Sequence, residues 1–264
     1  MELSIFQIDA FASEVFRGNP AAVVPLAEPL PVETMRRIAM ENNLAETAFL
    51  SPAQGSADHH IRWLSPTSEV ALCGHATLAS AHALWNELGF ARDTIRFSTE
   101  LSGELTVTRA DDLIQLDLPA YELEPVAETA DLASALAREP GEVYQAGPKL
   151  LCVLPTKRDV LETEPDMREL AQLDIEGVIV TAPGTKHDFV SRFFAPGIGV
   201  DEDPATGSSH CALAPYWARR IGRRRLSAHQ VSARGGELVC EHAGDRVYIA
   251  GKAVTYLRGT ITIP

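Results

Sequence analysis

The sequence predicts an α+β protein built from two similar halves, each a strand-rich layer around one central helix. Its 264 residues are enough for two domains, since a domain usually takes about 100–200 residues. The phrase Arg62-Trp63-Leu64-Ser65-Pro66 of the first half returns in the second as Arg192-Phe193-Phe194-Ala195-Pro196. After each copy a glycine opens an apolar segment with helical spacing, which indicates an internal duplication.

The two predicted central helices follow Gly74 and Gly207. Apolar residues recur at spacings of three and four over His75–Leu88 and over Ser208–Ile221, and a glycine follows each segment. Both segments are too apolar for a surface helix, so we expect each to be largely buried in its own half.

Short segments that are β-branched or alternating predict strands in both halves, bounded by Gly, Pro, Asp or Ser. In the first half these are Leu3–Asp9, Ala21–Pro25, Glu46–Leu50, His60–Leu64, Thr94–Ser98, Glu104–Thr108 and Leu113–Leu118. In the second half they are Gly177–Thr181, Asp188–Phe194, Gln230–Ser232, Glu237–Glu241, Arg246–Ile249 and Ala253–Thr262. Small surface helices are expected at Pro31–Glu41 and Met167–Leu173.

The stretch between Pro119 and Pro140 is rich in Glu, Asp, Ala and Pro and carries little β pattern. We therefore expect an N-terminal domain at residues 1–118, a linker at 119–140 and a C-terminal domain at 141–264. In this scheme the last strand is free to pack back on the N-terminal domain.

Composition excludes several classes of partner. With 23 basic and 36 acidic side chains the net charge is −13, which repels nucleic-acid phosphates and anionic lipid head groups. We therefore expect neither nucleic acid nor a membrane as a partner. The sequence has no N-terminal signal pattern and no run of about 18 apolar residues, which predicts a cytoplasmic protein. Its four cysteines form no C-x-x-C pair and are expected to be reduced thiols.

Two glycine-opened helices predict an anion site if the halves face each other. Backbone N–H groups at Gly74 and Gly207 would then converge on one cleft, where a small carboxylate substrate is the natural ligand. Ser208, directly after the second glycine, is a ready hydroxyl donor to such a ligand. The alternative is that the glycines permit tight turns and that the serine caps a helix.

Glu46 is the main candidate for proton chemistry. Strand alternation places this carboxylate in a row of apolar residues, namely Leu44, Ala48 and Leu50. The related stretch of the second half has Val180 at the corresponding place. Apolar neighbours could raise the pKa of Glu46 from about 4.3 to about 6–7, which suits a general acid or base. The alternative is a strand-end glutamate in solvent.

His75 and Asp203 flank the two helix openings. His75 follows Gly74, where a neutral imidazole can donate to or accept from a ligand. Asp203 precedes the second opening. Either residue could instead serve as a helix cap, and Asp203 could also belong to a solvated acidic turn.

Cys73 lies next to the first helix N-terminus, which can lower the pKa of a thiol and make it a base or nucleophile. Its counterpart in the second half is Thr206, which does no proton chemistry at ordinary pH. A two-thiol mechanism is therefore incomplete unless Cys211, one turn into the helix, takes that place. Histidines and cysteines lack zinc-ligand spacing, so no metal is expected, and no nucleotide-binding glycine motif occurs.

Several blocks together resemble the phenazine-biosynthesis PhzF-like isomerase/epimerase family. They are Gly18-Asn19-Pro20-Ala21-Ala22-Val23-Val24, Asn43-Leu44-Ala45-Glu46-Thr47-Ala48-Phe49, Cys73-Gly74-His75-Ala76-Thr77 and Asp203-Pro204-Ala205-Thr206-Gly207-Ser208. Two C-terminal blocks also fit, Gly235-Gly236-Glu237-Leu238 and Val247-Tyr248-Ile249-Ala250-Gly251-Lys252-Ala253-Val254. The blocks occur in order over essentially the whole chain, and their combination is specific.

The resemblance implies the fold of the diaminopimelate epimerase group. In that fold two pseudo-symmetric domains, each a barrel-like mixed β-sheet around a central helix, hold the active site in the interdomain cleft. The resemblance also implies a homodimeric enzyme without cofactor or metal. The family's acid/base carboxylate matches Glu46, and its supporting residues match His75, Asp203 and Ser208. Its glycines at the two helix N-termini match Gly74 and Gly207. One departure is that Cys73 stands where related racemases and epimerases carry one of two catalytic thiols, while Thr206 stands at the other position.

The sequence therefore leads to one main hypothesis and two alternatives. The main hypothesis is a cofactor-independent isomerase in which Glu46 moves a C–H proton on a small carboxylate, assisted by His75 and Asp203. The first alternative is a racemase, epimerase or dehydratase of an amino or hydroxy acid that uses Cys73. The second is a non-catalytic binding protein on the same fold. The residues that select the substrate lie outside these motifs, so the sequence assigns neither substrate nor pathway.

Overall fold

The structure, a computed structural model, describes residues 1–127 and 129–264 and divides into two compact units. Unit 1 consists of Met1–Asp117 and Ala250–Pro264, and unit 2 consists of Leu118–Ile249. The chain returns to unit 1 at its end, because strand β18 (Ala253–Thr262) pairs antiparallel with β1 (Glu2–Ala10).

The sheet of unit 1 is mixed, and its main strands follow the predicted segments. Besides β1 and β18 it contains β2 (Asn19–Pro25), β3 (Glu46–Pro52), β4 (His59–Leu64), β5 (Glu69–Val70), β6 (Thr94–Thr99), β7 (Glu104–Ala110) and β8 (Leu113–Pro119). Strand β2 is parallel to β3, and β4 is parallel to β6. The pairs β1–β2, β3–β4, β4–β5, β6–β7 and β7–β8 are antiparallel.

Unit 2 repeats this pattern of pairing. Its strands are β9 (Glu124–Pro125), β10 (Glu142–Ala146), β11 (Lys149–Val153), β12 (Gly177–Pro183), β13 (Phe189–Ala195), β14 (Val200–Asp203), β15 (Arg225–Gln230), β16 (Gly236–Ala243) and β17 (Arg246–Gly251). Strand β11 is parallel to β12 and β13 to β15, while β10–β11, β12–β13, β13–β14 and β15–β16 are antiparallel. The predicted duplication is therefore present in the topology, with β10 to β16 corresponding to β1 to β7.

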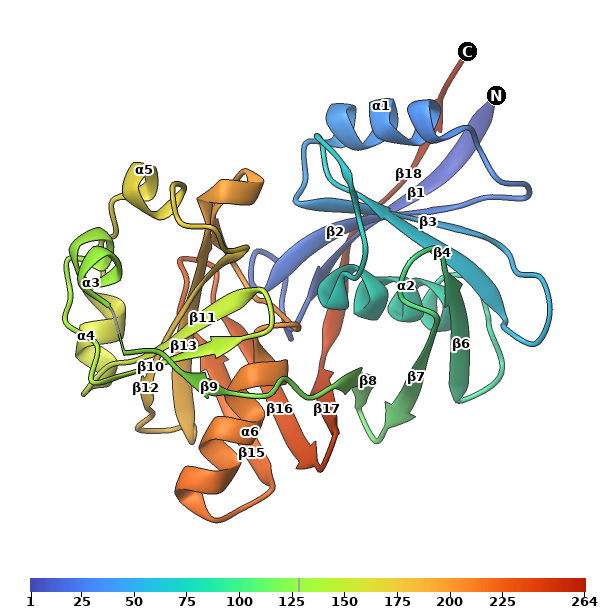
Figure 1. Ribbon diagram of the computed structural model, residues 1–264. Helices are drawn as coiled ribbons and strands as arrows, with labels where there is room; N and C mark the ends of the chain where they lie inside the picture. The colour runs from blue at the N-terminus through green and yellow to red at the C-terminus, as the bar shows by residue number, and fades with distance from the viewer. Residues whose placement is uncertain (128) are drawn as a thin grey trace. The chain divides into compact units, whose positions relative to one another are not determined.

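One long helix lies against the sheet of each unit. In unit 1, α2 (Gly74–Asn86) is buried from Gly74 to Trp85 and contacts β1, β2 and β3. Helix α1 (Val32–Asn42) covers the opposite face of these strands (Figure 1). In unit 2, α6 (His210–Ile221) contacts β15 and β16. Both central helices begin and end within two residues of the predicted segments, which confirms the apolar spacing as a helix signal.

Residues 119–127 and 129–140 are part of unit 2 and contain a strand and a helix, where a linker was expected. Strand β9 pairs with β10, and helix α3 (Ala130–Leu136) packs Leu132, Ala135 and Leu136 into a hydrophobic cluster. Helices α4 (Lys157–Leu161) and α5 (Met167–Leu170) contribute to the same cluster. The acidic composition concealed three apolar residues at helical spacing. Glu128, within the predicted linker, lies outside the described residues.

The expected mixed sheet around a central helix is present, and in unit 1 this sheet is not closed. In unit 1 the strands pair in the order β18, β1, β2, β3, β4, β6, β7, β8. Among the described residues no ladder joins β18 to β8, as closure would require. The sheet of unit 1 therefore covers its central helix without closing on itself.

The predicted strand at Gln230–Ser232 is displaced in the structure. Strand β15 begins earlier, at Arg225, and alternates exposed or partly buried residues with the buried side chains of Leu226, Ala228 and Gln230. The arginines at its start resemble a solvated turn and concealed the alternation. The hairpin of β10 and β11 was not predicted at all.

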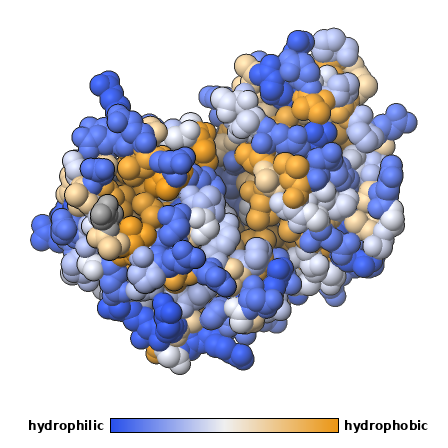
Figure 2. All heavy atoms as spheres, viewed as in Figure 1, coloured by the Kyte–Doolittle hydropathy of each residue, from blue (hydrophilic) through white to orange (hydrophobic). Residues whose placement is uncertain are grey.

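Polar and charged side chains cover much of the face drawn in Figure 2, with hydrophobic residues between them. Helix α2 is 13 residues long, whereas a membrane-spanning helix needs about 20. No helix in the described part of the chain has the length and apolar character required to cross a membrane.

Candidate active site

Glu46 is the first residue of β3 and lies on the face toward α2. Alternate residues of a strand share a face, and Phe49 packs into the cluster under α1 on the other face. Glu46, Ala48 and Leu50 therefore face α2, as predicted. Leu44 precedes the strand and packs against the α1 cluster, so its assignment to the same row is wrong. Alternation applies only from the residue at which the strand begins.

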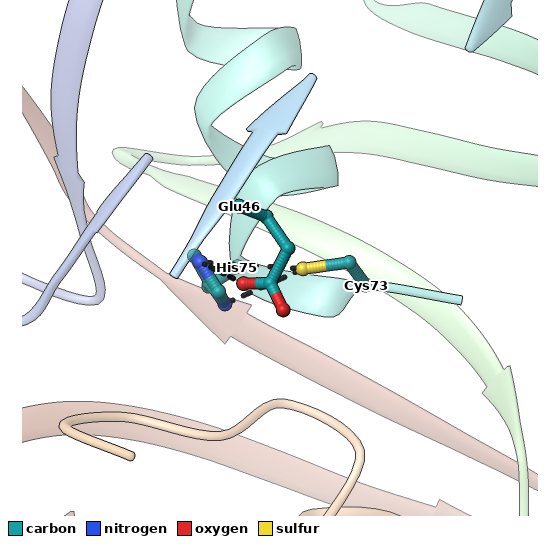
Figure 3. A group of neighbouring side chains, drawn as sticks. All are labelled: Glu46, Cys73 and His75. Atoms are coloured by element: carbon teal, nitrogen blue, oxygen red, sulfur yellow. Dashed lines mark hydrogen bonds and ion pairs between the residues drawn. The ribbon is translucent and has the colours of Figure 1, made fainter. Parts of the chain in front are cut away.

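Three polar side chains meet where β3 begins and α2 has its N-terminus (Figure 3). The Oε2 atom of Glu46 lies 3.2 Å from Nε2 of His75, and the two side chains are 16% and 5% exposed. The sulfur of Cys73, the N-cap residue of α2, lies 3.5 Å from Nδ1 and 4.0 Å from Nε2 of the same ring. We call these residues the Glu46–Cys73–His75 cluster.

The cluster sets the protonation of its members. Burial raises the pKa of Glu46, but the hydrogen bond and charge of His75 and the contact with Cys73 outweigh burial, so the pKa lies below its usual 4.5. Burial lowers the pKa of His75, yet its contacts with Cys73 and Glu46 raise it well above 6.5. Burial, reinforced by the Glu46 charge, raises the pKa of Cys73 to about 11. Near neutral pH the cluster therefore contains a carboxylate, an imidazolium and a thiol.

The predicted rise in the pKa of Glu46 to about 6–7 is therefore wrong in direction. The prediction counted only desolvation by apolar neighbours. It lacked the imidazole, which comes from a residue distant in the sequence and stabilises the charged carboxylate at 3.2 Å.

Asn19 contacts the other side of the imidazole ring. Its side chain is fully buried at the start of β2, with the amide nitrogen 3.1 Å from His75 Nδ1. An amide can offer its NH₂ to a neutral Nδ1 or, turned over, its oxygen to a protonated one. Gly18 before it has a φ of +62°, and a Cβ there would lie 2.0 Å from the backbone oxygen of Ala10. Glycine at this position therefore allows Asn19 to reach the ring.

The strand register identifies the counterpart of Glu46 in unit 2. Leu64 and Phe194 occupy the same position in the repeated sequence motif. Leu64 pairs with the second residue of β3, and Phe194 pairs with the second residue of β12. The first residues of these two strands, Glu46 and Gly177, therefore correspond. The prediction of Val180 at this place is wrong by three residues.

Gly177 leaves no room for a side chain. A Cβ at this position would lie 2.6 Å from the backbone oxygen of Phe194 and 2.7 Å from ring atoms of Phe193. Unit 2 therefore lacks a second acid/base carboxylate at this position for a steric reason, and the asymmetry between the halves is stronger than the sequence comparison suggested.

A duplicated ion pair supports the same correspondence. Arg62 donates to Glu69 through hydrogen bonds of 2.7 and 2.6 Å, and Arg192 donates to Glu202 through bonds of 2.6 and 3.0 Å. Both pairs join the short strand, β5 or β14, to its neighbour. Asp203 follows Glu202 directly. The corresponding residue of unit 1, which follows Glu69, is the apolar Val70.

Asp203 belongs to a buried hydrogen-bonded group in unit 2. The Thr206 hydroxyl donates to its carboxylate, and the Gln230 amide donates to its backbone oxygen over 2.7 Å. Gln230 also accepts from the backbone N–H of Thr206 over 2.8 Å. Gln230 is fully buried, and no sequence signal marked it as a site residue. Asn19, by contrast, lay inside a family block and could have been selected there.

Gly74 and Gly207 occupy different positions relative to their helices. Gly74 is the first residue of α2. Gly207 and Ser208 precede α6 in a turn, in which the N–H of His210 donates to the oxygen of Gly207 over 3.0 Å and that of Cys211 to Ser208 over 3.2 Å. The helix thus begins two residues later than predicted, because its first turn has tighter, 3₁₀-type bonds.

The predicted site residues fall into two groups, each described within its own unit. Unit 1 brings together Glu46 and His75 at the N-terminus of α2. Unit 2 holds the other group, Asp203, Gly207 and Ser208, near the start of α6. That both groups face one cleft stays a prediction.

Comparisons with known proteins agree with this geometry. The model of the family described as phenazine biosynthesis-like protein, PhzC-PhzF, matches residues 8–259. A Pseudomonas aeruginosa protein named an uncharacterized isomerase is 48% identical over 261 residues, with 99% of each chain covered. A crystal structure of a PhzF family phenazine biosynthesis protein from Enterococcus faecalis superposes with a TM-score of 0.95 at 43% identity, with 100% of each chain covered. The chain belongs to the PhzF family.

This PhzF-family chain is an isomerase, the class named for its relative, which speaks against the non-catalytic alternative. Its fold is shared more widely. A hydroxyproline epimerase from Agrobacterium vitis superposes with a TM-score of 0.63 at 15% identity, covering 98% of this chain and 92% of that one. At that identity the likeness concerns the fold alone.

The Glu46–Cys73–His75 cluster also offers donor atoms for a metal ion. One atom from each residue, a carboxylate oxygen, the thiol sulfur and a ring nitrogen, lies within 4.8 Å of the other two. This arrangement arises because the start of β3 meets the N-terminus of α2. No sequence spacing of the zinc-finger kind reveals it.

Proposed function

We propose that this PhzF-family isomerase moves a C–H proton on a small carboxylate substrate without a cofactor, with Glu46 as its single carboxylate acid/base. The observation that carries the proposal is the pairing of Glu46 with His75 at 3.2 Å in a largely buried setting. The steric exclusion of a side chain at Gly177 supports a mechanism with one such carboxylate.

Glu46 is in the form that the reaction needs at its start. Contact with His75 and Cys73 favours its carboxylate, which accepts the proton as the C–H bond breaks and leaves the electron pair on the substrate. The protonated Glu46 then returns the proton to another carbon of the same molecule. His75 stabilises the carboxylate between turnovers and, as an imidazolium, offsets negative charge that develops on the substrate.

The proposal assigns the substrate's carboxylate to the helix N-termini. The backbone N–H groups at Gly74 and Gly207 and the Ser208 hydroxyl would bind it, and Asp203 would orient the substrate. The first N–H groups of a helix have no acceptor within the helix and carry partial positive charge, which supports this assignment. A homodimer in the cytoplasm, expected from the resemblance and the composition, forms part of the same proposal.

Deuterium uptake from D₂O tests the central step. A panel of small carboxylates is incubated with the protein and followed by NMR, because proton abstraction is then detected without knowledge of the product. Glu46→Gln, which keeps the shape and removes the base, should lower exchange by about 10²–10⁴-fold while substrate still binds. Glu33→Gln on the exposed face of α1 is the matched control and should exchange like wild type. Normal exchange in Glu46→Gln would refute the proposal.

A second candidate uses Cys73, because its sulfur lies 3.5 Å from His75 Nδ1. In that case the protein would racemise, epimerise or dehydrate an amino or hydroxy acid. Cys73→Ala would then abolish exchange, and a thiol alkylator would inactivate the protein unless substrate protected it. The main proposal requires that exchange survive in Cys73→Ala and be lost in Glu46→Gln.

A further inference from the structure

We propose that Glu46, Cys73 and His75 also form a binding site for one Zn²⁺ ion, which inhibits the enzyme by occupying the atoms that transfer the proton. Three protein ligands of these types leave one coordination position open, an arrangement common in accessible zinc sites. The binding itself is independent of the proposed function. Only the inhibition rests on it.

The distances between donor atoms suit a tetrahedral ion. Zinc bonds of about 2.3 Å to sulfur and about 2.0–2.2 Å to nitrogen or oxygen place sulfur and nitrogen about 3.6 Å apart, and nitrogen and oxygen about 3.4 Å apart. The structure has Cys73 Sγ at 4.0 Å and Glu46 Oε2 at 3.2 Å from His75 Nε2. All three donors lie within 4.8 Å of one another (Figure 3), so rotation of the Cys73 and Glu46 side chains would bring them to bonding distance around one point beside Nε2.

Charge and ligand chemistry favour zinc over Mg²⁺ and Ca²⁺. A carboxylate and a thiolate together neutralise Zn²⁺, so the occupied site carries no net charge in its buried surroundings. The Cys73 thiol and the His75 imidazolium each give one proton to solvent as the Zn–S and Zn–N bonds form, so that the metal is bound by a thiolate and a neutral imidazole nitrogen. Sulfur and imidazole ligands exclude Mg²⁺ and Ca²⁺, which prefer oxygen.

Asn19 completes the surroundings of the site. A zinc-bound histidine usually donates its second ring N–H to a neighbouring acceptor, which fixes the ring. The Asn19 amide, 3.1 Å from His75 Nδ1, can supply this acceptor through its oxygen. The imidazole ring of His75 is therefore held in place with its Nε2 beside Oε2 of Glu46.

Metal titration tests the binding. Chelator-treated full-length protein is titrated with Zn²⁺ against a chromogenic chelator, and with Co²⁺ to detect a thiolate-to-cobalt charge-transfer band. One Zn²⁺ should bind per chain, and Cys73→Ala should weaken binding by at least about 100-fold and abolish the band. Cys152→Ala removes another buried thiol and should bind like wild type. Should it fail to fold, Cys240→Ala replaces it. Weak binding by wild type, or unchanged binding in Cys73→Ala, would overturn the site.

Deuterium exchange with and without zinc tests the inhibition. One equivalent of Zn²⁺ should suppress the exchange, and a chelator should restore it. Exchange that continues with zinc bound, or that requires zinc, would overturn the inhibitory role. If zinc-free protein exchanges no carboxylate, the proposed function fails, and the titrations still decide whether the metal site exists.

Discussion

Gly177→Ala tests the reason why unit 2 has no carboxylate at the position that corresponds to Glu46. The added Cβ would lie 2.6 Å from the backbone oxygen of Phe194 and 2.7 Å from ring atoms of Phe193. Neither neighbour moves easily, because Phe194 is held in the β12–β13 ladder and Phe193 is only 3% exposed. Overpacking of this kind costs about 1–3 kcal/mol. We therefore expect the melting temperature to fall by about 2–4 °C for each kcal/mol lost.

Scanning calorimetry and urea unfolding measure this loss, with Gly141→Ala as the matched control in the same unit. A Cβ at Gly141 has its nearest contact at 3.7 Å, to the oxygen of Val153, which is ordinary packing distance. The control should remain within about 0.5 kcal/mol of wild type. Exchange activity below the melting range should persist in Gly177→Ala, because Gly177 belongs to neither group of candidate site residues. Equal stability of the two variants would refute the steric argument.

Three further predictions concern the Glu46–Cys73–His75 cluster. Because its neighbours hold the pKa of Glu46 below 4.5, the acid-side midpoint of the kcat/KM profile for exchange should lie below pH 4.5. A fall beginning at pH 6–7 in the measured profile would contradict the lowered pKa of Glu46. Asn19→Ala should lower the unfolding free energy in urea by about 1–3 kcal/mol, since it leaves buried His75 Nδ1 with only the weakly hydrogen-bonding Cys73 sulfur beside it, and a loss below about 0.5 kcal/mol would argue against that contact. Burial raises the pKa of Cys73 to about 11 and of Cys211 to about 12, so mass spectrometry should find iodoacetamide labelling far slower in native than in unfolded protein. Rapid labelling of native Cys73 would instead favour the second candidate function.

The local elements could be predicted because their signals are contiguous. Apolar residues at spacings of three and four identified α2 and α6, and alternation identified most strands of unit 1. Helix α3 and the β10–β11 hairpin were missed, since acidic residues concealed the few apolar positions that pack. Glu46 and His75 were found as separate candidates from the sequence, and their contact at 3.2 Å depends on pairing across the fold.

The sequence by itself determined the duplication, the two central helices and the identities of the polar residues at their N-termini, because each of these depends on residues close together in the chain. The tertiary structure decided what depends on distant residues. The strand register made Gly177, and not Val180, the counterpart of Glu46. The approach of His75 and Cys73 lowered the pKa of a carboxylate that burial alone would have raised. Register and electrostatic contact are set by long-range pairing, and no local pattern of residues encodes them.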